Sequence, residues 1–161
     1  MMKDYLLLKN FLSKSDLLKV LKDVELNFEH NVHDDNLNSG VQTTSDLHLI
    51  NKEKHWLNFF NKLTIEMNKF NKKSIHKCWS LKVDRQQKSV YHKHVNLFTS
   101  VFYLQNKDFN LGTHLKYEEN EMIIPGYENS ILIFDGNILH DAVFPVEKLQ
   151  QPRYTLITDY E

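Results

Sequence analysis

The sequence contains a single cysteine, Cys78, so no disulfide can form within the chain. This usage is typical of an intracellular protein, and we expect a cytoplasmic location. No apolar run approaches the roughly 18–20 residues that a membrane-spanning helix needs. The short apolar run at residues 5–8 lacks the longer apolar region and the cleavage site of a signal peptide. We therefore expect neither secretion nor membrane association.

Arginine is also scarce, and the net charge is small. Arginine occurs at positions 85 and 153 alone, while lysine and asparagine are abundant, a bias typical of the AT-rich genomes of phages and small bacteria. The formal net charge of −1 gives no overall basic field, which argues against nucleic acid or an anionic membrane as partner. The length of 161 residues, with 41% hydrophobic and 25% charged residues, predicts one globular domain spanning residues 1–161.

The first 74 residues predict mainly helical support for the rest of the chain. Ser13 or Ser15 can cap a helix that runs to about Asn27. Aromatic and aliphatic residues recur at helical spacing over about 51–71, which predicts a second helix. A strand is expected at the N-terminus before the first helix, and the polar, turn-rich residues 30–46 predict a loop.

After residue 74 the pattern changes to short runs rich in Val, Ile, Phe, Tyr and Thr, separated by turn residues. Several short strands at this spacing predict a sandwich or barrel, and helices followed by strands give an α+β layout. Residues 75–161 therefore form the expected β core. Strands are expected at 75–83, 90–104, 113–118, 121–124, 131–134, 141–146 and 154–159.

Three histidines predict a metal site. His92 and His94 lie two residues apart in an expected strand, so both imidazoles point to one face while Lys93 points away. His140 follows an apolar strand and a turn, which places it at a strand end where barrels hold their ligands. Alone, such a pair is weak evidence, because it occurs more often in an ordinary strand without a metal. The other histidines lie in polar or amphipathic surroundings and are expected to be structural: His30, His33, His48, His55, His76 and His114.

Arg153 lies inside an expected strand in a chain that otherwise uses lysine. Its planar guanidinium binds a carboxylate through two parallel hydrogen bonds, which lysine cannot do. Thr155, two residues on, shares the same face of the strand and can donate a further hydrogen bond. The pair indicates a carboxylate-binding site, and a surface salt bridge of Arg153 is the alternative.

From Trp79 to its end, the sequence resembles the iron(II)- and 2-oxoglutarate-dependent oxygenases of the small phage and bacterial type. The resemblance consists of six elements that occur in the family's order, none of them specific alone. They are Trp79, His92–His94, Thr99–Tyr103, Pro125–Phe134, His140 with Pro145, and Arg153–Thr155. The segment Leu7–Ser13 before the first helix also resembles the usual opening of the family.

This resemblance implies a double-stranded β-helix, a jelly-roll barrel, with the N-terminal helices packed on its outside. It implies an Fe(II) centre that leaves three positions for 2-oxoglutarate and O₂. The implied enzyme hydroxylates an unidentified protein residue or small metabolite, releases succinate and CO₂, and uses ascorbate as reductant in vitro. The implied site residues are the metal ligands His92, His94 and His140, and the 2-oxoglutarate contacts Arg153, Thr155 and Tyr103.

The sequence departs from the commoner family pattern at the second ligand, where a carboxylate is usual and this chain has His94. A shifted register would pair His94 with Asn96, but imidazole is the better iron ligand, which favours the register that starts at His92. Asp141, adjacent to His140 on a strand, is expected to face the other way. Three histidines neutralise less charge than two histidines and a carboxylate, which predicts weaker iron binding.

Two other classes of protein remain open. One is a cupin-type barrel with a three-histidine metal site and no 2-oxoglutarate, and the other is a non-catalytic barrel with a structural or binding role. The glutamate expected shortly after a cupin His-x-His is missing, since residues 96–98 are Asn-Leu-Phe. Neither class needs a carboxylate clamp such as Arg153 with Thr155, so this pair discriminates between the three.

Overall fold

The computed structural model of the protein describes residues 5–30, 32–33, 41–88 and 90–161. The helices are α1 Lys14–His30, α2 Leu47–Ile50 and α3 Lys54–Asn68. The strands are β1 Tyr5–Leu8, β2 Val32–His33, β3 Val41–Thr43, β4 Ile75–Val83, β5 Phe98–Gln105, β6 Thr113–Tyr117, β7 Asn120–Ile124, β8 Ser130–Asp135, β9 Leu139–Ala142 and β10 Arg153–Tyr160.

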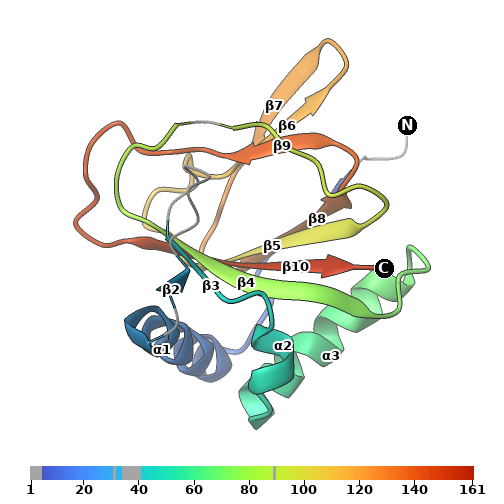
Figure 1. The fold of residues 1–161 in the computed structure, drawn as a ribbon, viewed down its shortest axis with the longest axis vertical. Helices are drawn as coiled ribbons and strands as arrows, with labels where there is room; N and C mark the ends of the chain where they lie inside the picture. Colours follow the sequence, from blue (N-terminus) through green and yellow to red (C-terminus); the bar gives the residue numbers. More distant parts are fainter. Residues whose placement is uncertain (1–4, 31, 34–40, 89) are drawn as a thin grey trace.

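The described strands form two sheets that face each other (Figure 1). The larger sheet has seven strands in the order β1-β8-β5-β10-β4-β3-β2, and the smaller has three in the order β7-β6-β9. Every neighbouring pair of strands is antiparallel. Neighbours such as β10 and β4 lie far apart in the sequence. The architecture is the expected double-stranded β-helix in an α+β chain.

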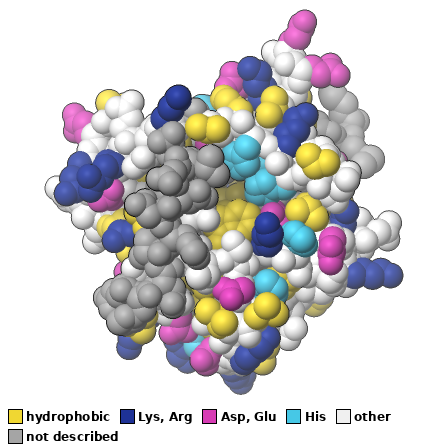
Figure 2. Space-filling view, viewed as in Figure 1, with side chains coloured by type: hydrophobic (Ala, Val, Ile, Leu, Met, Phe, Trp, Pro, Cys, Tyr) yellow, Lys and Arg dark blue, Asp and Glu magenta, His cyan; other side chains and the backbone are white. Residues whose placement is uncertain are grey.

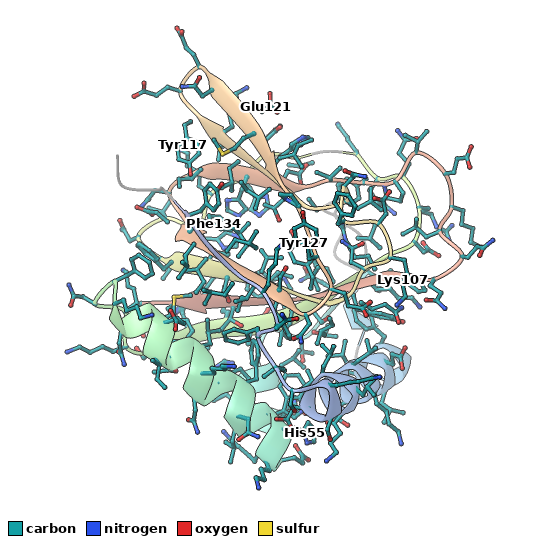
Figure 3. The ribbon with its side chains drawn as sticks, turned by 180° about the vertical axis from the view of Figure 1, so that it is seen from behind. His55, Lys107, Tyr117, Glu121, Tyr127 and Phe134 are labelled. Atoms are coloured by element: carbon teal, nitrogen blue, oxygen red, sulfur yellow. The ribbon has the colours of Figure 1, made fainter. Side chains whose placement is uncertain are left out.

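The N-terminal helices pack on the outside of the barrel, as expected. Seen from behind (Figure 3), α1 and α3 lie below the sheets, while the β6–β7 hairpin with Tyr117 and Glu121 extends away at the opposite end. The Ser13 hydroxyl accepts a hydrogen bond from the Asp16 backbone N–H at 3.1 Å, so Ser13 is the cap of α1. None of the described helices is long and apolar enough to cross a membrane.

Both long helices bury one apolar face against the large sheet. Because buried residues recur every three or four positions, each helix presents a continuous stripe to the core. In α1 the buried residues include Leu17, Val20, Val24 and Phe28, and in α3 they are Trp56, Phe59, Phe60, Leu63 and Met67. The Asp23 carboxylate accepts hydrogen bonds from the His55 and Trp56 rings at 2.6 and 2.9 Å, which joins the two helices.

Strand β10 separates this core from the interior of the barrel. It lies between β5 and β4, and all eight of its residues are buried. Because successive side chains of a strand alternate between its faces, each face has its own environment. Tyr154 and Leu156 belong to the core under the helices, whereas Arg153, Thr155 and Ile157 line a cavity between the sheets.

The expectation of a single loop over residues 30–46 is wrong. Helix α1 extends to His30, and the short strands β2 and β3 pair with each other and continue the large sheet beyond β4. Residues 31 and 34–40 of this expected loop lie outside the described residues. The strands were missed because their two- and three-residue lengths give no measurable alternation. With β1 paired to β8, the first 74 residues contribute strands to the large sheet as well as helices.

Two expected strands differ from the structure by more than one residue at an end. The strand predicted at 90–104 begins at Phe98, so the histidine pair precedes it. The strand predicted at 141–146 is β9, which starts at Leu139 and ends at Ala142. Val90 lines the cavity although it lies outside a regular strand. Val146 continues the apolar pattern after β9 but is 85% exposed, so the pattern there does not correspond to a strand.

Candidate metal centre and cofactor pocket

The segment that carries His92 and His94 is held in place by its own backbone. His92 and His140 exchange two backbone hydrogen bonds, each of 3.1 Å, which fixes the segment to β9. The His94 backbone N–H donates to the Gly136 carbonyl at 2.8 Å, and the Gly136 N–H donates to the Leu97 carbonyl at 2.8 Å. The segment is therefore held between β9 and the turn after β8, although it is not the strand that the sequence predicts.

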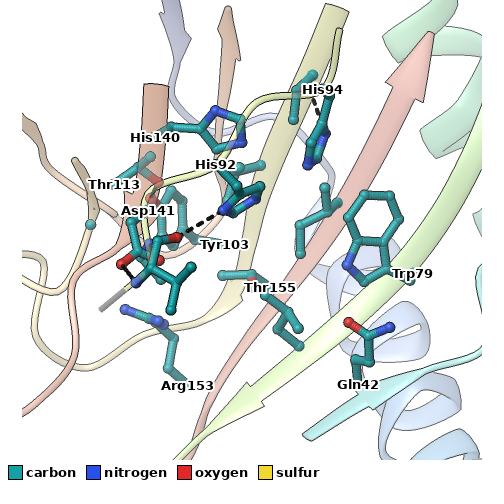
Figure 4. A pocket seen from close by; sticks show the side chains of 17 residues that line it. Gln42, Trp79, His92, His94, Tyr103, Thr113, His140, Asp141, Arg153 and Thr155 are labelled. Atoms are coloured by element: carbon teal, nitrogen blue, oxygen red, sulfur yellow. Dashed lines mark hydrogen bonds between the residues drawn. The ribbon is translucent and has the colours of Figure 1, made fainter. Parts of the chain in front are cut away.

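The three histidines that the sequence singles out lie together (Figure 4). One ring nitrogen of each lies within 4.8 Å of those of the other two. The ring centroids are 4.5 Å apart for His92 and His140, 4.9 Å for His94 and His140, and 5.1 Å for His92 and His94. A separation above about 8 Å would have ruled out a shared ion, given metal–nitrogen bonds of about 2.0–2.1 Å.

The hydrogen bonds of the three rings fix which nitrogen is free. Nδ1 of His92 lies 3.0 Å from the Val90 carbonyl, and Nδ1 of His140 lies 2.7 Å from the Ile138 carbonyl. A carbonyl oxygen can only accept, so Nδ1 carries the proton in both rings. Burial lowers the pKa of His140 to about 3, so this ring is neutral near pH 7. Its Nε2 lone pair is therefore available to a cation.

His94 is held by a different pair of groups. Its Nδ1 lies 2.8 Å from Oδ1 of Asp159 and 3.0 Å from the hydroxyl of Thr99, which itself donates to the same Oδ1 at 2.8 Å. Since the threonine proton goes to the carboxylate, both neighbours accept from the ring, and Nδ1 again carries the proton. Metal-binding histidines typically donate their second ring N–H to a carboxylate or a carbonyl in this way.

A cavity of about 310 Å³ extends from the histidines between the two sheets. Figure 2 shows the hollow on this face, with hydrophobic side chains in its floor and histidines beside it. Leu81, Val101 and Ile157 are among its apolar lining residues, and Trp79 and Gln42 lie on the wall opposite His140 (Figure 4). An apolar wall with a few polar groups is typical of a small-molecule site.

Arg153 lies inside this cavity and not on the surface. The residue is 2% exposed, and its Nη1 donates to the carbonyls of Leu111 and Val143 at 2.9 and 2.6 Å. Its buried Nε has no hydrogen-bond partner among the described residues. Burial lowers the pKa of the guanidinium, while the nearby Tyr103 and Asp141 raise it. A buried donor without a partner is costly, which indicates a ligand acceptor at this position.

Thr155 and Tyr103 line the same cavity as Arg153. Thr155 is 4% exposed and lies two residues along the same face of β10. The Tyr103 hydroxyl is paired with the Thr113 hydroxyl at 2.6 Å, and burial raises the pKa of this phenol. The structure thus brings all six residues of the expected site to one cavity, with the three histidines at one end and Arg153 at the other (Figure 4).

Sequence reasoning missed Asp159 and misplaced Asp141. Asp159 is 3% exposed on β10, and the signal that would have found it is the alternation that runs from Arg153 along one face of this strand. Asp141 was expected to face away from the site, but it lines the cavity. Its Oδ2 accepts a hydrogen bond from the Val90 backbone N–H at 2.7 Å, and the strand ends one residue later, at Ala142. Its carboxylate is not among the grouped ligand atoms.

Asn96, the ligand of the shifted register, is exposed and is not among the residues that line the cavity. It has a positive φ of 65° in the turn before β5, and its backbone N–H donates to the Asn137 side chain. Of the other histidines, His55 pairs with Asp23, His76 lies 3.7 Å from Glu161, and His114 stacks on a tyrosine. The side chains of residues 30 and 33 lie outside the described part of the chain.

No family model matches the sequence, and no curated protein matches it. The fold does match solved structures. The non-heme alpha ketoglutarate (2-oxoglutarate) dependent epimerase SnoN from nogalamycin biosynthesis has a TM-score of 0.79 at 9% identity, over 98% of this chain and 77% of its own. A prolyl hydroxylase from Trichoplax adhaerens, in complex with a peptide fragment of hypoxia inducible factor, has a TM-score of 0.70 at 16% identity, over 99% and 84%.

A viral collagen prolyl hydroxylase from Paramecium Bursaria Chlorella virus-1, solved with 2OG, has a TM-score of 0.65 at 13% identity and covers 99% of this chain and 95% of its own. At such low identities the likeness shows the fold. The chain therefore has the double-stranded β-helix fold found in 2OG-Fe(II) oxygenases, as the sequence resemblance implied. The same fold serves a small-molecule epimerase and a peptide-binding hydroxylase, so it does not by itself define a substrate.

Proposed function

We propose that this protein is an Fe(II)- and 2-oxoglutarate-dependent dioxygenase that hydroxylates a substrate and releases succinate and CO₂. The observation that carries the proposal is one cavity with three free imidazole nitrogens at one end and a buried, partly unpaired guanidinium at the other. The fold shared with 2OG-Fe(II) oxygenases supports the reaction class.

The donor set fits a first-row divalent metal. Each of the three imidazoles keeps its Nδ1–H on an acceptor and leaves Nε2 free. Neutral imidazole is a ligand that iron accepts readily, and three protein ligands leave positions for the oxo-acid and O₂. When bound, the metal supplies the oxidising chemistry, and the protein supplies orientation and a shielded cavity. His92, His94 and His140 would hold it.

The opposite end of the cavity fits a dicarboxylate. Arg153 already satisfies the carbonyls of Leu111 and Val143 with Nη1, which leaves Nε for a ligand. The Thr155 side chain shares its face, and Tyr103 adds a hydroxyl at the wall. We propose that these three groups bind the distal carboxylate of 2-oxoglutarate and so orient the oxo-acid along the cavity toward the histidines.

The cavity walls and the proton positions follow from the chain itself. Apolar residues such as Leu81, Val101 and Ile157 exclude bulk water from the space between the anchor and the histidines. Exclusion of water strengthens the hydrogen bonds of Arg153 to a bound carboxylate. Burial lowers the pKa of His140 to about 3, and its single proton is held on Nδ1 by the Ile138 carbonyl, so Nε2 remains unprotonated across the physiological range.

A cupin-type three-histidine metalloprotein without 2-oxoglutarate is the second candidate. The absence of a carboxylate among the grouped ligand atoms favours it. The burial of Arg153 favours the oxygenase, because a three-histidine site with no oxo-acid has no use for a guanidinium in its cavity. A non-catalytic barrel is disfavoured for the same reason.

The direct test is production of succinate. Purified protein with Fe(II) and ascorbate should convert 2-oxoglutarate slowly to succinate in the absence of a substrate, and succinate is measured by chromatography. The matched control is His140→Ala. It removes a proposed ligand that is 5% exposed, and it should abolish succinate formation. Equal succinate from both proteins, or none from either, would move the assignment to the cupin-type or the non-catalytic class.

A further inference from the structure

Asp159 is a buried carboxylate for which the proposed reaction gives no role. It is 3% exposed and follows Arg153 by six residues on the cavity-facing side of β10, about 20 Å further along the strand. Its Oδ1 accepts hydrogen bonds from the Thr99 hydroxyl and from Nδ1 of His94, both at 2.8 Å. The carboxylate therefore lies directly behind one of the three grouped histidines.

Among the described residues, no lysine or arginine pairs with Asp159, whose polar contacts are with Thr99 and His94. Arg153 is too far along the strand to neutralise it. A buried carboxylate is costly unless a positive charge lies near it. A divalent cation on Nε2 of His94, across the ring from the carboxylate, is such a charge.

The three grouped histidines are not equivalent. His92 and His140 donate Nδ1–H to backbone carbonyls, whereas His94 donates to a carboxylate. A carboxylate behind the ring raises the basicity of the imidazole as a ligand and fixes its orientation. His94 also occupies the position where the family that the sequence resembles has a ligating carboxylate. In this chain the negative charge of Asp159 would therefore lie one imidazole ring further from a bound metal than a ligating carboxylate does.

We propose that Asp159 is a positioning residue that acts through His94. It fixes the tautomer of the ring and supplies the negative charge that a ligating carboxylate would otherwise supply to the metal. A site with three neutral ligands thereby holds a divalent cation with partial charge compensation. This inference rests on the metal site of the proposed function and adds a residue to it.

The test is the affinity of the metal-free protein for Co(II), measured by competition with a chromophoric chelator. Asp159→Asn keeps the shape of the side chain, and its amide oxygen still accepts from His94, so the charge alone is lost. We expect Co(II) to bind about 10–100-fold more weakly, the usual loss when the outer partner of a ligating histidine is changed. The melting temperature of each metal-free protein controls for a change in folding.

Two further variants separate the charge from the packing. Thr99→Val is close in shape, removes a neutral donor to Asp159 and should change the Co(II) affinity much less than Asp159→Asn does. His94→Asp places a carboxylate at the ligand position. In that background Asp159→Asn should leave the Co(II) affinity unchanged or raise it, because Asp159 then faces a like charge.

The outcomes are distinct. If the unaltered protein binds no Co(II), both the metal site and this inference fail. If it binds Co(II) and Asp159→Asn binds it equally well, this inference alone fails, and Asp159 with His94 is an ion pair that only stabilises the barrel. Should Asp159→Asn not fold, proton NMR of the Zn(II)-loaded unaltered protein decides: a downfield Nδ1–H resonance of His94 supports the role, and protonation of its Nε2 overturns it.

Discussion

The two arginines of this chain lie in opposite environments, so one serves as the control for the other. Arg153 is 2% exposed in the cavity, while the side chain of Arg85 is 62% exposed and pairs with the adjacent Asp84. A lysine at position 153 would keep the charge but lose the planar pair of donors. Only the buried position should therefore be sensitive to the shape of the cation.

Arg153→Lys should weaken the binding of 2-oxoglutarate by about 1.5–3 kcal/mol, the contribution of a hydrogen bond to a charged group. Co(II) affinity should be unchanged, because a guanidinium offers no lone pair to a metal and Arg153 lies at the end of the cavity opposite the histidines. Calorimetry of 2-oxoglutarate with the Co(II)-loaded protein measures the first quantity. Arg85→Lys should leave it unaltered. Equal 2-oxoglutarate affinity in Arg153→Lys would mean that the guanidinium serves only the Leu111 and Val143 carbonyls.

At the scale of residues, the sequence predicts the position of those side chains whose type and context indicate one function. The sequence alone identifies an arginine in an apolar strand and two histidines two residues apart. All three residues line the cavity. Asp159 does not stand out, because aspartate is most often exposed to solvent. Its environment depends on β5 and on the segment before it, which supply Thr99 and His94 from 60 and 65 residues away.

A contact between the turn after β8 and the segment before β5 positions the proposed metal ligands. The Gly136 backbone exchanges hydrogen bonds with the segment from His94 to Leu97. A Cβ at Gly136 would lie 2.5 Å from the His94 carbonyl oxygen and 2.7 Å from that of Leu97, both of them backbone atoms that cannot rotate away. Glycine is therefore required here for the close approach of the chain to itself.

Gly136→Ala should displace His94 and lower the Co(II) affinity by about tenfold or more, the lower range for loss of support to a ligating histidine. Gly126→Ala is the comparison, since its Cβ would lie 2.4 Å from the Tyr103 ring at the other end of the cavity. We expect that substitution to weaken 2-oxoglutarate binding and to spare Co(II) affinity. The same chelator competition and calorimetry measure both. Identical losses in the two variants would indicate general destabilisation instead.

At the scale of elements, regular patterns were predictable and irregular ones were not. The strand predicted at 75–83 has the bounds of β4, in which Trp79 and Leu81 line the cavity and Cys78 belongs to the core under the helices. The spacing of the histidine pair predicts a strand, yet its segment forms a bridge to His140 and hydrogen bonds to Gly136. Period-two spacing does not distinguish a strand from an extended segment that bonds to two different partners.

The whole molecule brings together groups from separate elements across the cavity. His140 belongs to the small sheet, Arg153 belongs to the large sheet, and the other two histidines belong to the segment that connects β4 to β5. The order of strands in each sheet brings them together, and that order arises from pairings such as β10 with β4. The sequence resemblance implied this arrangement, whereas propensities alone predicted no more than a sandwich or barrel.

Because the proposed metal ligands come from β9 and from the segment that connects β4 to β5, metal binding should stabilise the whole fold. A ligand that binds only the folded state at 100 times its dissociation constant adds about 2.7 kcal/mol to the free energy of unfolding. For a chain of this size, that corresponds to a rise of about 5–10 °C in the melting temperature. Co(II) should give this rise in the unaltered protein and not in His140→Ala, as measured by differential scanning fluorimetry under nitrogen.

Melting temperatures with and without Co(II) then test whether the two ends of the cavity bind opposite ends of one ligand. The oxo-acid bridges the metal and Arg153 in the proposed site, so 2-oxoglutarate should raise the melting temperature further when Co(II) is present and much less when it is absent. Succinate, which has no 2-oxo group to reach the metal, should give equal small shifts with and without Co(II). If 2-oxoglutarate shifts the melting temperature equally with and without Co(II), the carboxylate site and the histidine site are independent. That result would contradict a shared oxo-acid site.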